Sequence, residues 1–124
     1  FVTMTTPAWT GVDVWTQSEG EKLVGIQPDG NTVPVEQMST GTMGQLYFAL
    51  RLAGYSSFAR EPGPLPMVLD DIMETFDDAR ARGALQLCAE IGANGQAILF
   101  THHAHLVELA RDCIDGVAIV NMPD

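Results

Sequence analysis

The first third of the chain alternates between apolar and polar positions, a pattern typical of half-buried β-strands. Residues 12–16 alternate cleanly, residues 22–27 do so less regularly, and residues 32–35 form a third short run. The turn-forming sequence Pro-Asp-Gly-Asn at residues 28–31 separates the last two runs. Short strands joined by such turns predict an antiparallel β-meander, so we expect residues 1–37 to be a β-rich segment.

Three stretches of residues 38–124 place apolar residues at helical spacing. The first helix carries the stripe Leu46, Ala49, Leu50 and Ala53. The second carries Ala81, Ala84, Leu85, Cys88 and Ile91. The third buries Leu106, Leu109 and Ala110. Gly54 and Gly92 are placed to end the first two helices, and Thr75-x-x-Asp78 predicts the start of the second through a capping-box-like arrangement.

Three short apolar runs, at residues 66–69, 97–100 and 117–120, predict strands between and after these helices. The first two have the composition of strands that are buried on both faces. Residues 60–64, Arg-Glu-Pro-Gly-Pro, are expected to form the loop before the first of them. The alternation of helices and strands predicts an α/β fold with β-α-β-α-β units and a parallel sheet.

Titratable residues follow the first two of these strands directly. Asp70 and Asp71 come after the first, and His102 and His103 come close behind the second. Because consecutive parallel strands end at the same edge of a sheet, we expect Asp70, Asp71 and His102 to lie together there. Carboxylates at such an edge suit Mg²⁺ beside phosphates. The alternative is a strand that simply runs into an acidic surface turn.

A small, polar loop at residues 38–45 precedes the first helix and contains Ser39, Gly41 and Thr42. The free N–H groups and the positive dipole end of a helix N-terminus suit a phosphate. The alternative is a plain helix cap, in which Ser39 or Thr42 holds the first turn.

Four segments together resemble the nucleotide-binding motifs of ABC-type ATPase heads. Residues 39–42 with Gln45 resemble the signature loop, and residues 66–71 resemble the Walker B strand. Residues 74–77 are similar to the D-loop, and residues 100–102 are similar to the switch-histidine strand. Each motif is short, but the four occur in the family's order, which makes the resemblance specific.

The resemblance is strongest to the SMC-like group, whose heads sit on long coiled coils and include DNA double-strand-break repair and RecF/RecN-type ATPases. Residues 45–53 and 100–103 look most like bacterial YhaN-type proteins. Heads of this group consist of two lobes separated in sequence by the coiled coil. The resemblance covers roughly residues 20–122 and implies a P-loop NTPase fold. We therefore expect residues 1–124 to be a single C-terminal lobe, without the N-terminal lobe and coiled coil.

The resemblance also implies roles for residues that serve the nucleotide on the same head. Asp70 would hold Mg²⁺, Asp71 would act as the catalytic base that orients the attacking water, and His102 would contact the γ-phosphate of ATP. Positioning and charge neutralisation are the main requirements of phosphoryl transfer.

Three further residues would act across a homodimer of heads. Ser39 and Gly41 would reach the nucleotide bound on the second head, and Asp77 would lie at the dimer seam. The implied partners are the N-terminal lobe, a second ATPase head and, through the complete protein, DNA in repair or chromosome maintenance.

The chain departs from the family pattern in three places. Thr40 replaces the usual second signature glycine, and Asp71 replaces the usual glutamate. No G-x-x-x-x-G-K-[ST] occurs in these 124 residues, and the one lysine, Lys22, lies in an acidic, strand-like stretch. We therefore expect the isolated chain to bind ATP weakly and to have negligible ATPase activity.

Two other functions remain open. The first is a metal-dependent phosphohydrolase or nuclease, because clustered carboxylates and imidazoles bind catalytic metals. Its ligands would come from Asp70, Asp71, His102, His103 and His105. The second is a module that dimerises around ATP without hydrolysing it, as a consequence of Thr40 and Asp71.

Composition excludes several classes of protein. With 16 Asp and Glu against six Lys and Arg, the formal net charge is −10, which argues against this lobe gripping a nucleic-acid backbone by itself. No apolar run approaches the roughly 20 residues of a membrane span, and no signal-peptide pattern opens the chain. We expect a cytoplasmic protein with Cys88 and Cys113 as buried thiols, and with Trp9 and Trp15 in the core.

Overall fold

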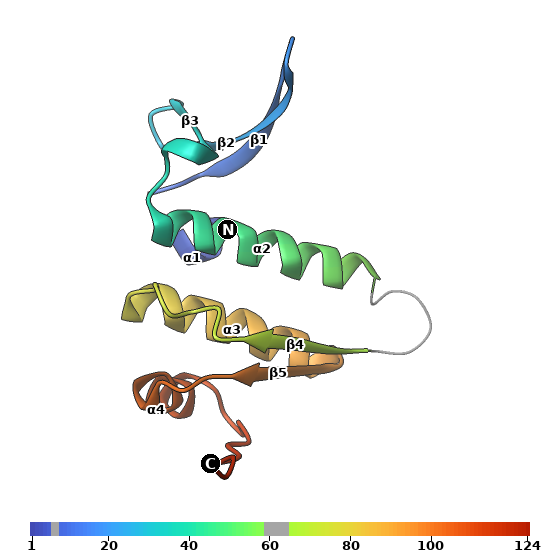
Figure 1. Cartoon of the computed structure of the whole chain (residues 1–124), viewed down its shortest axis with the longest axis vertical. Coiled ribbons are helices and arrows are strands. Elements are labelled where there is room, and N and C mark those ends of the chain that lie inside the picture. The colour runs from blue at the N-terminus through green and yellow to red at the C-terminus, as the bar shows by residue number, and fades with distance from the viewer. Residues whose placement is uncertain (6–7, 59–64) are drawn as a thin grey trace. The chain divides into compact units, whose positions relative to one another are not determined.

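The computed structural model of the chain describes residues 1–5, 8–58 and 65–124. The chain divides into two compact units, Phe1–Tyr55 and Ser56–Asp124, and each is described here by itself (Figure 1). That they form one lobe stays a prediction. The predicted loop at residues 60–64 lies outside the described residues. Among the helices described, none has the length and apolar character needed to cross a membrane.

The first unit contains the predicted antiparallel meander. Its strands β1 (Gly11–Gln17), β2 (Gly20–Ile26) and β3 (Thr32–Pro34) follow one another in the sheet. Gln17 pairs with Gly20, so a two-residue turn joins β1 to β2, and Gly20 adopts a φ of 124° that suits glycine. Two short helical segments, α1 (Val2–Thr5) and η1 (Val35–Gln37), precede and follow the three strands along the chain.

The core of the first unit is built around Trp9. It packs in a buried cluster with Val35, Met38 and Leu46. Gly25 on β2 makes room for the indole, because a Cβ atom there would lie 2.5 Å from Trp9 Cζ3. The prediction that Trp9 lies in the core is confirmed. The same prediction for Trp15 is wrong: the side chain projects from β1 and is 40% exposed.

Helix α2 (Thr40–Phe58) extends beyond the predicted helix at both ends. Gly54 does not end it, because one glycine inside a helix costs only about 1 kcal/mol, which the flanking turns tolerate. At the other end, Gly41 and Thr42 form the first helical turn rather than a loop.

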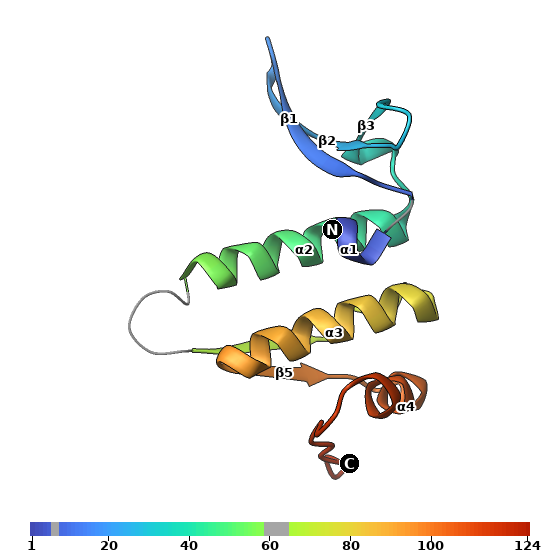
Figure 2. The ribbon, with the colours of Figure 1, turned by 180° about the vertical axis from the view of Figure 1, so that it is seen from behind.

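The second unit contains the predicted β-α-β unit and confirms the α/β class. Strands β4 (Pro66–Asp70) and β5 (Gln96–Phe100) pair in parallel, and helix α3 (Asp78–Asn94) connects them. Figure 2 shows α3 in front of the sheet, and Figure 1 shows it behind, so α3 covers one face. Helix α4 (Ala104–Cys113) follows β5 and packs against α3.

Two strand predictions for the second unit are wrong. Residues 114–124 contain no helix or strand, so no strand forms at residues 117–120 and the parallel sheet has two strands in the described part of the chain. A strand needs a neighbour for its hydrogen bonds, and no described strand pairs with this segment. Strand β4 is also not buried on both faces. Met67 and Leu69 are buried, whereas Val68 is 58% exposed, because α3 covers one face only.

Candidate functional site

The carboxyl ends of β4 and β5 bring Asp70, Asp71 and His102 to one edge of the parallel pair, as predicted. Asp70 is the last residue of β4 and lies opposite Phe100 in the register. The Asp71 N–H then donates a hydrogen bond of 2.9 Å to the Phe100 carbonyl oxygen. The chemical roles of these residues stay predictions, but their shared location is a property of the fold.

Asp71 has a left-handed backbone conformation, with a φ of 48°. Most side chains avoid this region, and Asp and Asn are among the few that tolerate it. This conformation turns the backbone away from the direction of the strand, so the chain leaves the sheet directly after Asp71.

The Asp71 carboxylate lies close to two histidines. Its Oδ2 is 3.0 Å from His102 Nδ1, and its Oδ1 is 3.7 Å from His103 Nε2. The two imidazole rings lie 4.1 Å apart between centroids. The His103 N–H donates to Thr101 Oγ1 at 3.1 Å, which holds the short turn after β5. The sequence patterns had favoured a surface or capping role for His103, with a metal ligand as the alternative.

His103 occupies the N-cap position of α4, yet its side chain makes no capping hydrogen bond. A residue at this position usually offers a side-chain oxygen to the helix, and imidazole is a poor substitute. The signal in the sequence that favours a site role for His103 is therefore the pair of consecutive histidines directly after a strand, where a capping residue is expected.

Asp70 fits the predicted role of a Mg²⁺ ligand by its chemistry and its surroundings. The residue is exposed, and its carboxylate makes no hydrogen bond or ion pair within the described part of the chain. A free carboxylate at this edge supplies one of the hard oxygen ligands that Mg²⁺ prefers, with phosphate oxygens and waters as the usual others. Asp70 is not part of the cluster around Asp71.

Ser39 is the cap of α2. Its Oγ accepts a hydrogen bond from the Thr42 N–H at 3.2 Å and lies 2.8 Å from Thr42 Oγ1. The alternative prediction of a plain helix cap is therefore confirmed for Ser39. A role of Ser39 and Gly41 toward a second head stays a prediction, and both residues belong to the first unit.

Asp77 is the cap of α3. Its Oδ1 accepts a hydrogen bond from the Arg80 N–H at 2.9 Å, and its Oδ2 lies 3.4 Å from Arg80 Nε. The predicted start at Thr75 is therefore wrong, because the carboxylate two residues later satisfies the free N–H groups of the first turn. Gly92 also does not end α3, which continues to Asn94. The role of Asp77 at a dimer seam stays a prediction.

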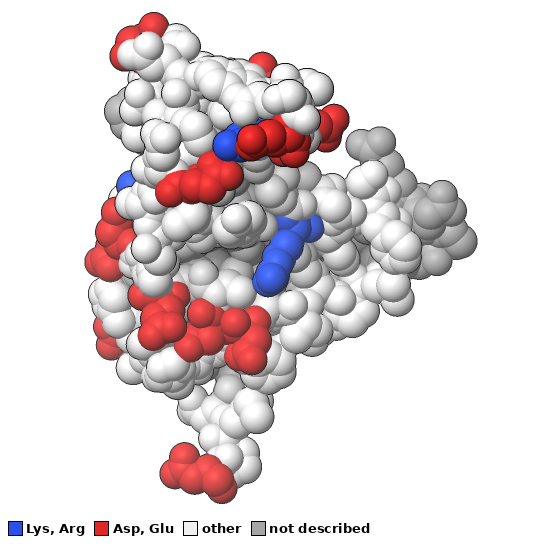
Figure 3. Space-filling model, turned by 45° about the horizontal axis from the view of Figure 1, so that its top comes forward, with Lys and Arg blue, Asp and Glu red and all other residues white. Residues whose placement is uncertain are grey.

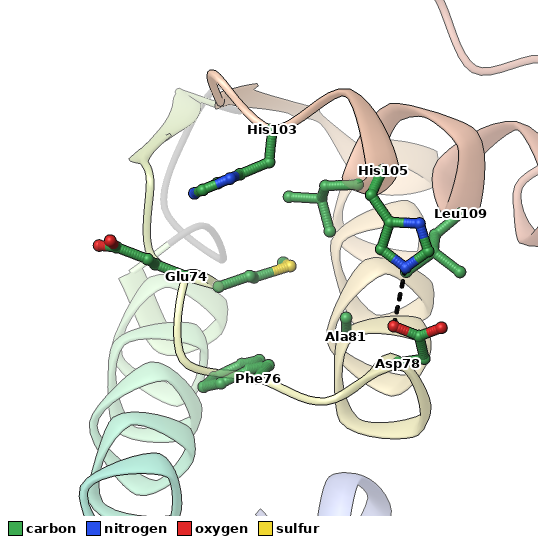
Figure 4. Close-up of a pocket in the computed structure, with 9 residues that line it drawn as sticks. Glu74, Phe76, Asp78, Ala81, His103, His105 and Leu109 are labelled. Atoms are coloured by element: carbon green, nitrogen blue, oxygen red, sulfur yellow. Dashed lines mark hydrogen bonds and ion pairs between the residues drawn. The ribbon is translucent and has the colours of Figure 1, made fainter.

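A small pocket opens beside His103, with a volume of about 140 Å³ (Figure 4). Its apolar lining includes Met73 and Leu109. His105 on its wall pairs with Asp78, with 2.8 Å between Nε2 and Oδ1, and this hydrogen bond raises the pKa of His105. His105 therefore belongs to a separate pair, and the predicted five-residue metal cluster is wrong in including it.

Cys88 is poorly placed for nucleophilic chemistry. Cys88 is buried on α3, and burial raises the pKa of its thiol to about 11, so little thiolate forms at neutral pH. Both cysteines are free thiols; Cys88 is buried as predicted, whereas Cys113 is only partly buried, so the prediction of a buried thiol there is wrong.

Solved structures of SMC heads share this arrangement of elements. A chain from a study of ATP-driven dimerisation and DNA-stimulated activation of SMC ATPases matches with a TM-score of 0.71 at 20% identity, over 100% of this chain and 73% of that one. The Smc head of Pyrococcus furiosus bound to the C-terminal domain of ScpA matches with a TM-score of 0.64 at 18% identity, over 88% of this chain and 27% of that one. The chain has the fold of the C-terminal lobe of an SMC head.

Sequence relatives of this SMC-type lobe agree with the predicted resemblance. The YhaN protein of Bacillus subtilis is 30% identical over 103 residues, which are 82% of this chain and 10% of that protein. The Rv1278 protein of Mycobacterium tuberculosis is 37% identical over 73 residues, which are 59% of this chain and 8% of that protein. No model of a known protein family matches the chain. The SMC-type lobe thus spans about a tenth of the length of these curated relatives.

Proposed function

We propose that this chain is the C-terminal half of an ATP-binding and ATP-hydrolysing head, within a cytoplasmic SMC-like protein that serves DNA repair or chromosome maintenance. The observation that carries the proposal is the meeting of Asp70, Asp71 and His102 at one edge of β4 and β5, in a fold shared with SMC heads. The chain covers a tenth of its YhaN relative, which supports an N-terminal lobe supplied by another part of a longer protein.

In the proposed head, Asp70 would hold Mg²⁺, which would supply neutralisation of the phosphate charge. Asp71 orients the attacking water and accepts its proton. In the structure, Asp71 Oδ2 lies 3.0 Å from His102 Nδ1. If His102 turns instead toward the γ-phosphate of ATP, Oδ2 is released to act as the base. Binding of the nucleotide would thus free the Asp71 carboxylate to act as the base in its hydrolysis.

The proposed head works as a dimer. Ser39 and Gly41, at the N-terminus of the 19-residue helix α2, reach the nucleotide of the second head, and Asp77 lies at the seam. Helix N-termini are suited to phosphates, which supports this assignment. Hydrolysis would then depend on dimerisation, so that ATP closes the pair of heads and its loss opens it.

Contacts with DNA are assigned to the rest of the complete protein. Acidic groups are widespread on the face shown in Figure 3, where few Lys and Arg side chains appear. The formal net charge of −10 would repel phosphates, so a DNA contact requires basic surfaces elsewhere in the protein.

The test is to reconstitute the chain with the N-terminal lobe and to measure nucleotide affinity, dimer mass and phosphate release. Asp71→Asn should slow hydrolysis strongly while ATP-bound dimers persist, because it removes a base but little volume. Ser39→Arg should leave ATP binding intact and prevent dimers. Asp70→Ala should weaken Mg²⁺-dependent nucleotide binding. Asp115→Asn, an exposed residue after α4, is the matched control and should change nothing.

Two results would contradict the proposal. One is steady ATP turnover by the 124-residue chain alone that Asp70→Ala abolishes, since the chain has no phosphate-binding lysine loop. The other is normal ATP-dependent dimerisation of the Ser39→Arg variant, which would show that Ser39 does not belong to a signature loop at the dimer seam.

A second candidate is a head that dimerises around ATP without turnover. The observation that favours it is the short Asp71 side chain, whose Oδ1 is shielded from solvent. ATP-dependent dimers of the unmodified protein without phosphate release would select this candidate over the first.

A further inference from the structure

The cluster of Asp71, His102 and His103 contains the donor set of a transition-metal site rather than that of a Mg²⁺ site. Each residue contributes one ligand atom, and the three atoms lie within 4.8 Å of one another. Two of the three are imidazole nitrogens. Mg²⁺ prefers oxygen ligands and an octahedral shell, whereas imidazole suits zinc and its neighbours in the first transition row.

We propose that Asp71, His102 and His103 bind a divalent transition ion, with Zn²⁺ as the ion that fits the geometry best. Zinc sits about 2.0–2.1 Å from nitrogen and oxygen ligands in a tetrahedron, which places neighbouring ligand atoms about 3.3 Å apart. Asp71 Oδ2 lies 3.0 Å from His102 Nδ1, and Asp71 Oδ1 lies 3.7 Å from His103 Nε2. Both nitrogens thus lie near a zinc-ligand spacing from the carboxylate, each from a different one of its two oxygens.

Two polar atoms of the cluster lack partners. Asp71 Oδ1 and His103 Nε2 are both shielded from solvent, and neither has a hydrogen-bond partner within the described part of the chain. Their separation of 3.7 Å is too long for a hydrogen bond. Shielded polar atoms are costly unless they are satisfied, and one cation between these two would satisfy both.

The backbone holds the ligands in place without an ion. Asp71 is fixed by its left-handed conformation and by the hydrogen bond to Phe100, and His103 is fixed by the hydrogen bond to Thr101. The side chain of His102 is 70% exposed, so the site is open on that side. Three protein ligands and an open side describe a site that completes its coordination with water.

This site is separate from the Mg²⁺ position assigned to Asp70, which is not part of the cluster. The inference goes beyond the proposed ATPase function and does not depend on it. An ion on Asp71 would occupy the proposed base, so metal binding and base catalysis exclude each other at this residue. For that reason the test is done without nucleotide.

The experiment titrates the 124-residue chain with Zn²⁺ against a competing chelator, and with Co²⁺ followed by visible absorption, both in millimolar Mg²⁺. We expect one saturable site and the intense visible bands of four-coordinate cobalt. Asp71→Asn, His102→Ala and His103→Ala should each weaken binding at least about tenfold, the lower limit for groups that merely support metal ligands. His105→Ala is the matched control, since it removes the third of the three histidines in the chain and should leave affinity unchanged.

Far-UV circular dichroism of each variant separates loss of a ligand from loss of the fold. His102→Ala is the decisive variant, because a side chain that is 70% exposed contributes little to packing. The proposal is overturned if Zn²⁺ binding is not saturable at one site, if excess Mg²⁺ displaces it, or if His105→Ala weakens it as much as His102→Ala does. None of these outcomes changes the ATPase test, which uses the reconstituted head.

Discussion

The backbone N–H of Asp71 donates a hydrogen bond of 2.9 Å to the carbonyl oxygen of Phe100. This bond continues the parallel ladder one residue past the end of β4, and so ties the two strand ends together. His102 and His103 follow Phe100 within three residues, which keeps both imidazoles close to the Asp71 carboxylate. The geometry of the whole site therefore depends on the backbone at Asp71.

The first prediction tests this backbone. Asp71→Val should lower the free energy of unfolding by about 1–3 kcal/mol, because a β-branched residue is strained at a φ of 48°. Asp71→Asn, which tolerates that conformation, should fold as stably as the unmodified chain. Denaturant unfolding of the two variants compares them directly, and equal stability would mean that the left-handed conformation is absent in solution.

The second prediction concerns the cap of α3. Asp77→Ala should lower the free energy of unfolding by about 0.5–2 kcal/mol, because the Arg80 N–H loses its acceptor. Asp77→Asn keeps an acceptor oxygen and is the control, with little expected change. Thermal unfolding followed by circular dichroism measures both, and a full loss in the Asn variant would point to the carboxylate charge instead.

The third prediction concerns the contact between Gly25 and Trp9. A Cβ atom at residue 25 would lie 2.5 Å from Trp9 Cζ3 and 2.6 Å from Met38 Cε, so Gly25→Ala should cost about 1–3 kcal/mol of stability by overpacking. Gly11→Ala is the control, since its nearest contact would be 3.4 Å. Combining Gly25→Ala with Trp9→Leu should recover part of the lost stability. If the double variant instead loses the sum of the two single-variant costs, the contact between residues 25 and 9 is contradicted.

The fourth prediction concerns Gln45, which is fully buried on α2. Neither its amide nitrogen nor its amide oxygen has a hydrogen-bond partner in the described part of the chain. Gln45→Met keeps the shape and removes the unpaired amide, so it should raise the free energy of unfolding by about 1 kcal/mol. Gln45→Glu should lower it, because a charge would replace the amide. A strongly destabilised Met variant would show that water or a ligand satisfies the amide.

The fifth prediction concerns pH. The hydrogen bond to Asp78 raises the pKa of His105, so this pair stabilises the fold below the ordinary imidazole pKa of 6.5. The contribution is lost as the pH rises through the raised pKa, and it is small because both side chains are exposed. An NMR titration should show a lower pKa for His105 in Asp78→Asn. Glu108→Gln should lower it less, and equal effects would contradict the assigned pair.

Local patterns in the sequence were sufficient for the meander, the β-α-β order and the shared edge of Asp70, Asp71 and His102. Hydrophobic periodicity reports which face of an element is buried, and parallel strands joined by a helix must end at the same edge. The predictions that failed depended on neighbours. Trp15 alternates correctly but remains exposed, and residues 117–120 have the composition of a strand but no described strand beside them.

The sequence by itself determined the class of fold, the order of its elements and the sheet edge at which Asp70, Asp71 and His102 lie. Only the tertiary structure decided which titratable residues meet there. His103 joins Asp71 while His105 pairs with Asp78, although the two histidines are two residues apart. The physical reason is that a side chain's direction after a strand depends on one or two backbone angles and on the hydrogen bonds that fix them. The left-handed turn at Asp71 and the bond from His103 to Thr101 are such features, and no periodicity in the sequence encodes them.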